Sequence, residues 1–384
     1  MSVRAAVIEA PGRFSVESFP YPDPDAGAVV LRIEHSGICG TDKHTWRGES
    51  LQYAGTDHER EAAYPLICGH ENVGVIEVIG PGEPPLDELG RPLAIGDRVV
   101  PAPNLTCGRC RFCLDERFPY YLCASLHDYG NSLTCRREPH LFGGWSEVMY
   151  LLPGTRLFRV PESLPSHLAV LTELAAVTHG LDAARALDGT GAGFRFGDSV
   201  LVLGAGPLGL MHLVKADLLG AGRLLASDVF PRRLDIAAAF GADVRLDAST
   251  TSREERLAAV LDATDGYGAD VVVHCTGHAA TFPEALALVR PGGTVIEPGT
   301  FVDMGDVPVN PSRDICTKGV TIIGIGGETL PQYAPALRML DRHASRLPLD
   351  RIVTHRVGLG DVGDALELAQ RAEAMKVLVT PAMS

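Results

Sequence analysis

The stretch VLVLGAGPLG, from Val200 to Gly209, is the most informative about the fold of this 384-residue chain. Its first four residues are apolar, as in a buried strand of a parallel sheet, and the G-x-G-x-x-G turn opens an apolar helix. Glycines at 204, 206 and 209 permit a tight turn, close approach to a pyrophosphate, and close packing of helix on strand. Since the helix N-terminus supplies amide donors, we predict a dinucleotide-binding turn, against the alternative of a glycine-rich turn that binds nothing.

The end of the next apparent strand sharpens this prediction. Asp228 closes RLLASD, 19 residues beyond Gly209, where a carboxylate can accept hydrogen bonds from an adenosine ribose. Its charge would repel a 2′-phosphate and favours NAD over NADP, although Arg232 and Arg233 keep NADP open. The predicted cofactor contacts in this region are Gly204, Gly206, Pro207, Leu208, Gly209, Asp228 and Arg233.

Composition limits the class of protein. The chain is 46% hydrophobic and 21% charged, and its length suits two domains with substantial cores. Its formal charge of −14 argues against nucleic acid or an anionic membrane as the main partner. No apolar run has the length of a membrane span, and the first residues do not resemble a signal peptide. We therefore expect a cytoplasmic globular protein.

The pattern of apolar residues changes along the chain. Short β-branched segments at 29–33, 73–79 and 97–100 predict a β barrel or sandwich in the first 150 residues. From about Ser166, helix-like and strand-like stretches alternate, which predicts crossover units and a parallel sheet. A strand at TIIGIGG, an amphipathic stretch at 333–347 and a closing helix and strand follow, and periodicity alone does not say where they dock.

Four cysteines, Cys107, Cys110, Cys113 and Cys123, lie within seventeen residues in the spacing C-x2-C-x2-C-x9-C. Four thiolates in one short loop form a closed tetrahedral site, as a structural zinc requires. Disulfides are the alternative, which a reducing cytosol disfavours. We predict structural zinc, with Cys135 as a less favoured substitute for Cys123 because it would close a longer loop.

A second metal site is suggested by Cys39, in GICGTDKH, and His70, in CGHEN. A thiolate and an imidazole from separate loops could share a zinc if the fold brings them together. Taken singly, each residue is more typical of a core, as a small buried thiol and a hydrogen-bonded histidine.

Taken together, these motifs resemble the zinc-dependent medium-chain alcohol and polyol dehydrogenase family. The likeness runs nearly the whole length, through GICGTDKH, GHENVGVIEVIG, the four-cysteine lobe, LFGGWSEV, VLVLGAGPLGL, ASD and GGTVIEPG, in that order. It implies an α/β fold, with a β-rich GroES-like catalytic domain and a Rossmann domain built on a doubly wound parallel sheet. The implied domains are 1–165, with the zinc lobe at about 104–125, then 166–312, and a return segment, 313–384, that completes the first.

The resemblance assigns roles residue by residue. Cys39 and His70 would be catalytic zinc ligands, and Glu71 a ligand or an exchangeable neighbour. Thr41 and His44 fall where the family has its proton relay, and Asp42 where a carboxylate orients the ligating histidine. Candidate cofactor-lining loops are HCTG, PGTF and GIGG, which contribute Thr276, Gly299 and Thr300.

The third protein ligand is where this chain departs from the family. A motif like EPLA usually has a histidine seven residues after its glutamate, whereas here His179 follows Glu173 by only six. We expect Glu173 or Glu71 as ligand, or both in turn, because catalytic zinc changes its coordination number. Thr172 as the aligned residue would leave fewer protein ligands. The last gap in the cysteine lobe is also longer than the usual seven residues.

The resemblance thus implies two zinc ions per subunit, one catalytic and one structural. The expected reaction is oxidation of a secondary or primary alcohol, with proton loss aided by zinc and hydride transfer to NAD, or less favourably NADP. Alternatives are a simple-alcohol or aldehyde dehydrogenase, a lyase or epimerase that oxidises only transiently, and a non-catalytic nucleotide sensor. A homodimer or homotetramer is implied, with TIIGIGG near an interface.

Three stretches exceed the family's core: 50–64, 81–93 and 125–140. Variable loops on a fixed scaffold usually set specificity. The first separates Cys39 from His70 and contains the charged run His58, Glu59, Arg60 and Glu61. We therefore expect a polyol, sugar or cyclitol substrate, against the alternative of a merely solvated loop.

Overall fold

The computed structural model describes residues 2–56, 59–115, 118–187 and 191–383. The chain separates into two compact units, Met1–Glu173 with Thr329–Ser384, and Leu174–Glu328. The predicted limits, after residues 165 and 312, both lie earlier in the chain. Among the helices of the described segments, none combines the length and apolar character needed to cross a bilayer.

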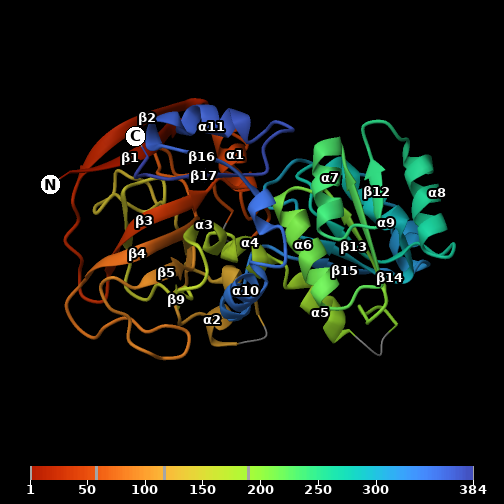
Figure 1. The fold of residues 1–384 in the computed structure, drawn as a ribbon, viewed down its shortest axis with the longest axis horizontal. Coiled ribbons are helices and arrows are strands. Elements are labelled where there is room, and N and C mark those ends of the chain that lie inside the picture. Colours follow the sequence, from red (N-terminus) through yellow and green to blue (C-terminus); the bar gives the residue numbers. More distant parts are fainter. Residues whose placement is uncertain (1, 57–58, 116–117, 188–190, 384) are drawn as a thin grey trace. The chain divides into compact units, whose positions relative to one another are not determined.

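The second unit is built on a six-stranded sheet in the order β12-β11-β10-β13-β14-β15, with every neighbouring pair parallel (Figure 1). This order reverses direction beside β10, as in a doubly wound dinucleotide-binding sheet, and it confirms the predicted Rossmann architecture. The strands are β10 (Ser199–Leu203), β11 (Arg223–Asp228), β12 (Val244–Asp247), β13 (Ala269–His274), β14 (Val289–Glu297) and β15 (Thr321–Gly324).

Helices cover both faces of this sheet (Figure 1). One face carries α5 (Gly180–Ala186), α6 (Pro207–Leu218) and α7 (Pro231–Ala239), and the other carries α8 (Arg253–Ala263) and α9 (Phe282–Leu288). The short helices η2 (Ala279–Thr281) and η3 (Pro311–Cys316) complete the unit.

The helix-like stretch from Ser166 divides into three helices, α3 (Ser166–Ala169), α4 (Thr172–Val177) and α5. Threonine hydroxyls accompany both breaks, because Thr172 Oγ1 donates to Ala169 O and Thr178 Oγ1 to Ala175 O, each at 2.6 Å. Such local bonds offer the backbone an alternative to a continuous helix.

The first unit is built on a seven-stranded sheet in the order β16-β17-β3-β4-β5-β9, with β8 also paired to β3. Its strands are β3 (Val29–Gly37), β4 (Glu71–Ile79), β5 (Arg98–Pro101), β8 (Val148–Leu151), β9 (Leu157–Arg159), β16 (Val353–Val357) and β17 (Lys376–Val379). The C-terminal strand β17 thus joins the N-terminal half of the chain, with Leu378 opposite Gly37.

The remaining elements of this unit surround its sheet. They are β1 (Ser2–Ala10), β2 (Arg13–Pro20), α1 (Gly40–Arg47), β6 (Asn104–Leu105), α2 (Arg111–Leu114), η1 (Tyr120–Leu122), β7 (His127–Asp128), α10 (Leu330–His343), η4 (Leu349–Arg351), η5 (Leu359–Asp361) and α11 (Val362–Leu368).

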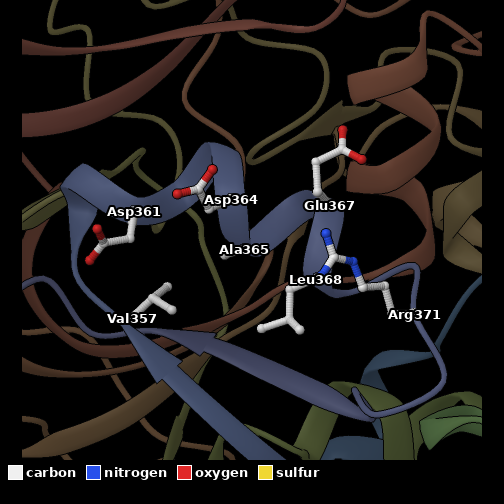
Figure 2. Close-up of a pocket in the computed structure, with 7 residues that line it drawn as sticks. All are labelled: Val357, Asp361, Asp364, Ala365, Glu367, Leu368 and Arg371. Carbon is white, nitrogen blue, oxygen red and sulfur yellow. The ribbon is translucent and has the colours of Figure 1, made fainter.

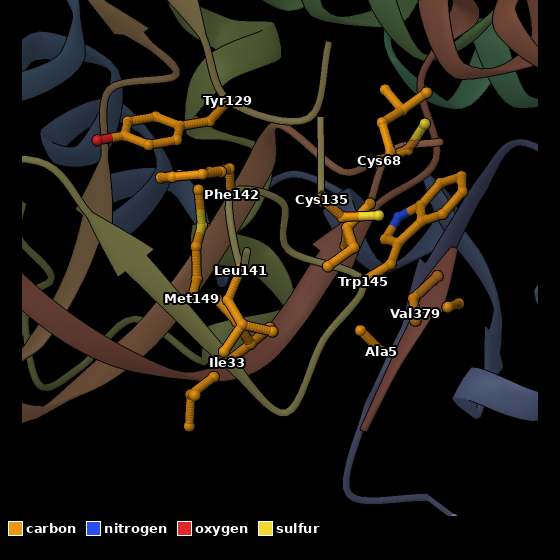
Figure 3. Packing of buried hydrophobic residues seen from close by; sticks show 14 of the residues in the cluster. Ala5, Ile33, Cys68, Tyr129, Cys135, Leu141, Phe142, Trp145, Met149 and Val379 are labelled. Atoms are coloured by element: carbon orange, nitrogen blue, oxygen red, sulfur yellow. The ribbon is translucent and has the colours of Figure 1, made fainter. Parts of the chain in front are cut away.

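A large apolar core supports the first unit. It includes Trp145 together with Cys68 and Cys135, all at most 1% exposed (Figure 3). A separate small cluster holds Tyr121, Cys123 and Leu126 with the other three lobe cysteines packed against it. Cys135 therefore belongs to the main core, and the structure does not support it as a lobe ligand.

Candidate active site and metal centres

Helix α1 positions the first group of predicted site residues. Cys39 is its N-cap residue, and the Cys39 amide donates to Asp42 Oδ2 at 2.7 Å. A carboxylate three residues into a helix satisfies an otherwise unpaired N-terminal amide. This local bond fixes the Cys39 thiol and the fully buried Asp42 at one end of the helix.

Strand β4 brings the second group to the same place. Its first residue is Glu71, opposite Gly37 of β3, and His70 precedes it. The Glu71 side chain lies directly over Gly37, where a Cβ atom would come within 1.9 Å of Glu71 Oε2. Only glycine at position 37 leaves room for this carboxylate.

Cys39, His70 and Glu71 form one donor set, in which one ligand atom from each residue lies within 4.8 Å of the others. Glu173, on α4, is buried but is not in this set, although its negative charge acts on both His70 and Lys376. Thr172 donates its hydroxyl to Ala169, as described above, which leaves it poorly placed to serve instead.

Lys376 is the residue that sequence reasoning missed. It begins β17, and its Nζ lies 2.6 Å from both Glu71 carboxylate oxygens and 3.1 Å from Ile38 O. Both side chains of this ion pair are at most 3% exposed. The sequence signal for this pair is a single lysine at the start of the apolar segment KVLV. A lysine in a buried strand requires an anionic partner.

Charge in this cluster is unbalanced toward the negative. Burial works against a charged imidazole, yet the Cys39 thiol and the carboxylates of Asp42 and Glu173 outweigh it and raise the pKa of His70 well above its ordinary value. Burial likewise opposes the charge of Lys376, but Glu71, Cys39 and Glu173 raise its pKa. A thiol, an imidazole and nearby carboxylates in excess over one ammonium form a donor set that fits a divalent zinc ion.

Asp42 lies beside His70, with Oδ1 3.8 Å from His70 Nδ1. Burial raises the pKa of Asp42, while His70 opposes that shift. Within the described segments neither of these two atoms has a hydrogen-bond partner. The separation exceeds a hydrogen bond, so the predicted orienting role of Asp42 stays a prediction.

His44, four residues along α1 from Gly40, has partners for either protonation state. Its Nδ1 lies 2.9 Å from Glu49 Oε2, which can only accept, and 3.1 Å from Arg47 Nη2, which can only donate. Burial lowers the pKa of His44 below its ordinary value, with Glu49 opposing and Arg47 adding to the shift. Thr41, the other predicted relay residue, is half-buried on the same helix.

The four lobe cysteines lie together, with one sulfur from each within 4.8 Å of the others. The Cys107–Cys113 and Cys110–Cys113 sulfur separations are 3.9 and 3.5 Å. A tetrahedron with Zn–S bonds of about 2.3 Å has edges of about 3.8 Å, so these sulfurs fit a structural zinc.

Backbone amides also point at these sulfurs. Ala124 N lies 3.4 Å from Cys110 Sγ, and this donor lowers the pKa of that thiol to about 6. Burial raises the pKa of Cys123 to about 12, although the amides of Cys107 and Ser125 oppose the shift. A bound dication would supply the charge needed to hold all four as thiolates.

In the second unit, the predicted turn adopts the expected geometry. Gly204 has φ +93°, and a Cβ on Gly209 would come within 1.9 Å of Gly204 O. Pro207 and Leu208 begin α6, with Gly206 as N-cap. Asp228 accepts from Ala205 N and Phe230 N at 2.8 and 2.9 Å, and Arg233 Nη1 lies 3.7 Å from the same carboxylate.

Two predicted loops follow β13 and β14 in this unit. A Cβ on Gly299 would come within 2.6 Å of Thr276 O, so the two loops are in contact. Thr300 donates through both its amide and its hydroxyl to Glu297. His179, considered above with Glu173, lies in this unit with its Nε2 3.0 Å from Gly327 O.

The chain is similar to known dehydrogenases over nearly its whole length. A model described as "Alcohol dehydrogenase GroES-like domain" matches residues 25–162, and one described as "Zinc-binding dehydrogenase" matches residues 207–342. The chain is 31% identical to 5-exo-hydroxycamphor dehydrogenase of Pseudomonas putida, over 98% of each chain. It belongs to the zinc-dependent medium-chain alcohol and polyol dehydrogenase family. The predicted family, enzyme class and GroES-like and Rossmann fold are thereby confirmed.

Two further similarities extend this result within the dehydrogenase family. The chain is 30% identical to erythritol/L-threitol dehydrogenase of Mycolicibacterium smegmatis, covering 99% of this chain and 98% of the relative. The crystal structure of an alcohol dehydrogenase from Thermotoga maritima matches with a TM-score of 0.88 and 30% identity, covering 99% of each chain.

The loop at 50–64 is held by internal contacts. Arg60 forms an ion pair with the buried Asp128, and its guanidinium lies 4.9 Å from the centre of the Tyr53 ring. Glu59 accepts from Gly55 N at 2.8 Å. Arg60 and Glu59, which the sequence suggested as substrate-facing charges, therefore bind other residues of the protein. His58 lies outside the described residues.

A surface hollow on α11 is separate from these predicted sites (Figure 2). It is lined by Val357, Asp361, Asp364, Ala365, Glu367, Leu368 and Arg371. None of the predicted ligands, relay residues or cofactor contacts lines it. Glu367 also accepts from Trp46 Nε1 at 2.6 Å, which ties α11 to α1.

Proposed function

We propose that this dehydrogenase oxidises a polyol, sugar or cyclitol with NAD at the donor set of Cys39, His70 and Glu71. The observation that carries the proposal is this group of three donor types, in which His70 and Glu71 are buried and Cys39 is half-buried. Zinc held there would act as a Lewis acid that lowers the pKa of an alcohol in its open position. The four lobe cysteines would hold a second, structural zinc.

Glu71 is proposed as an exchangeable ligand, since Lys376 binds both of its oxygens. Glu173 is proposed as the alternative carboxylate, because its charge already acts on His70. Asp42 would keep His70 in the orientation in which Nε2 faces the metal, because its carboxylate lies on the Nδ1 side. Exchange between Glu71 and Glu173 would keep the metal bound while one coordination position is open to the alcohol.

The proposed proton path runs from the alcohol through Thr41 to His44 and then to solvent. Glu49 accepts from Nδ1 when that nitrogen is protonated, and Arg47 donates to it when it is not. A histidine with a partner in each state can accept and release a proton without an unpaired buried nitrogen.

The proposed cofactor is NAD, bound at Gly204–Gly209 with Asp228 toward its ribose. The Asp228 side chain is 4% exposed, so its charge is poorly screened and would repel a 2′-phosphate. Arg233, whose charge would attract that phosphate, is already beside Asp228. Thr276, Gly299 and Thr300 are proposed to line the nicotinamide end.

The similarity to erythritol/L-threitol dehydrogenase supports a polyol. A second candidate, a cyclic secondary alcohol, is favoured by the similarity to 5-exo-hydroxycamphor dehydrogenase and by the internal use of Arg60 and Glu59. These candidates differ in the number of hydroxyls that the pocket must hydrogen-bond.

Two further proposals concern the protein's state. All nine cysteines are free thiols in the structure, which supports a reducing, cytoplasmic location. We also propose a homodimer or homotetramer that uses β15, because this strand is an edge of its sheet and Ile322 on it is 40% exposed.

A substrate panel with zinc-replete protein tests the function. It would compare four- to six-carbon polyols, cyclitols, cyclic secondary alcohols and simple aliphatic alcohols, each with NAD and NADP, by absorbance at 340 nm. We expect the highest kcat/KM for a polyol with NAD, and a loss on the order of 1000-fold in Cys39→Ser, because zinc activation is worth several kcal/mol.

Each other outcome of this panel has a meaning. Strong turnover of aliphatic alcohols without polyol turnover would overturn the substrate class. Product formation with tightly bound NAD and no net change at 340 nm would indicate a lyase or epimerase. Unchanged activity in Cys39→Ser would overturn the site itself.

A further inference from the structure

A hydrogen-bonded His–Glu pair lies at the carboxyl ends of β13 and β14 in the second unit. His274 and Glu297 are the last residues of these two strands, whose preceding residues, Val273 and Ile296, are paired in register. His274 is fully buried, and its Nδ1 lies 2.5 Å from Glu297 Oε2. None of the roles assigned above uses this pair.

Glu297 holds the loop that follows its own strand. Its Oε1 accepts from Gly299 N, Thr300 N and Thr300 Oγ1, at 3.0, 3.0 and 2.9 Å. With Oε2 bound to His274, both carboxylate oxygens have donors. Bonds to a charged acceptor are the stronger kind, so this carboxylate fixes the shape of loop 298–300.

His274 holds the other loop. Its Nε2 lies 2.6 Å from Thr281 Oγ1 and 3.1 Å from Thr276 Oγ1. The Thr281 oxygen also lies 2.6 Å from Thr276 Oγ1 and 2.7 Å from His278 O. The segment 276–281 is therefore closed on itself around the imidazole.

The polar contacts of His274 involve both ring nitrogens. Because Glu297 Oε2 is a carboxylate oxygen, Nδ1 is the donor in that bond. Nε2 lies between the hydroxyls of Thr281 and Thr276, each of which can donate or accept. The imidazole therefore links the Glu297 carboxylate to the hydroxyls of loop 275–281.

The loop after β13 reaches the glycine turn, and the loop after β14 packs against the loop after β13. A Cβ on Gly204 would come within 2.9 Å of Thr276 Cγ2 and 3.0 Å of Cys275 O. Gly299, in turn, lies against the backbone of His274 and Thr276. The loop after β13 therefore lies against both the glycine turn and the loop after β14, and the His274–Glu297 pair links these last two loops.

We propose that His274 and Glu297 are positioning residues for the dinucleotide, which hold loop 298–300 against loop 275–281, itself packed on the glycine turn, and so set the affinity for the nicotinamide cofactor. This inference rests on the proposed function, in which these loops line the cofactor. The pair fixes loop shape before the cofactor arrives, so ordering these loops costs less on binding.

Glu297→Gln tests the proposal in the full-length, zinc-replete protein. Titration with NADH, followed by nicotinamide fluorescence, should give a Kd roughly tenfold above that of the unaltered protein, since bonds to a charged group are lost. At saturating cofactor, kcat should change by less than about threefold.

Asp270→Asn is the matched control. Asp270 and Arg290 form an ion pair near the opposite ends of the same two strands, at 2.5 Å, and Asp270 also accepts from Ser199 N and Oγ. This variant loses comparable bonds and should leave the Kd for NADH unchanged.

A gentler pair of variants covers the case in which Glu297→Gln does not fold. Thr281→Val removes the hydroxyl that is hydrogen-bonded to His274 Nε2 and should raise the Kd, whereas Thr281→Ser should keep the Kd of the unaltered protein. An unchanged Kd in Glu297→Gln or Thr281→Val, or an equal rise in Asp270→Asn, would overturn the proposal. Failure of the unaltered protein to bind NADH or NADPH would overturn the proposed function as well.

Discussion

The two sulfur-containing clusters of the first unit differ in how the chain builds them. The lobe cluster comes from seventeen consecutive residues, uses one donor type, and needs only a local loop. The cluster around Cys39 combines α1, the start of β4 and the start of β17, and mixes a thiol, an imidazole, carboxylates and an ammonium. A closed set of four thiolates leaves no position for substrate, whereas a mixed and buried set can exchange ligands. Chemistry is therefore expected only in the second.

The largest expected effect comes from the ammonium that distinguishes the mixed cluster. Lys376→Met leaves Glu71 buried and unpaired, and removal of one partner of a buried pair costs about 3 to 5 kcal/mol. We expect this loss in the free energy of unfolding, measured by urea denaturation with activity and fluorescence as separate probes.

The control for Lys376→Met is Arg4→Met, which breaks the exposed pair of Arg4 with Glu147 and should cost less than about 1 kcal/mol. The double variant Lys376→Met with Glu71→Gln should recover part of the loss, because no charge is then left unpaired. Equal costs for Lys376→Met and Arg4→Met would show that the pair does not organise the cluster.

The lobe should lose stability without losing catalysis. Cys110→Ser removes one of four sulfurs from the closed site, and loss of a metal is among the changes that destabilise proteins most, here by about 3 kcal/mol. We expect metal content to fall from two zinc ions per subunit to one and the thermal midpoint to drop. The kcat/KM of the remaining folded protein should stay within about threefold.

Cys316→Ser, at an exposed cysteine outside both clusters, should leave the metal content, the thermal midpoint and kcat/KM unchanged. A stable Cys110→Ser protein with an abolished chemical step would mean that the roles of the two metals have been exchanged.

The same contrast explains what the sequence could and could not predict. The lobe and the turn at Gly204–Gly209 are local, so spacing alone was informative, and the alternation of strands and helices predicted the parallel sheet. The meeting of Cys39 with His70 was reached only through family resemblance, because it depends on the pairing of β3 with β4.

The pairing of Lys376 with Glu71 spans 305 positions and was not predicted at all. The Arg60 side chain was interpreted as facing a substrate, because a sequence does not show that Asp128 is its partner. Register and long-range charge pairing are properties of the folded chain, so local patterns carry little information about them.

The smallest of these effects concerns the proton path at the edge of the mixed cluster. Because burial lowers the pKa of His44, the imidazole is neutral and able to accept a proton at neutral pH. Alcohol oxidation should therefore fall as the pH drops through a midpoint below 6.5, where His44 becomes protonated. Glu49, Arg47 and Lys43 are the charged groups that act on this imidazole.

His44→Asn should lower kcat by about 100-fold, the lower end for general acid–base catalysis, and should remove that acidic limb from the profile of kcat against pH between 5 and 8. His167→Asn, which alters an imidazole in contact with Asp350 instead, should keep both the rate and the limb. Retention of the limb in His44→Asn would place the proton acceptor elsewhere. Loss of the limb without loss of zinc would show that His44 can be replaced while the metal donors stay intact. Proton transfer and metal binding would then be separate properties of neighbouring residues.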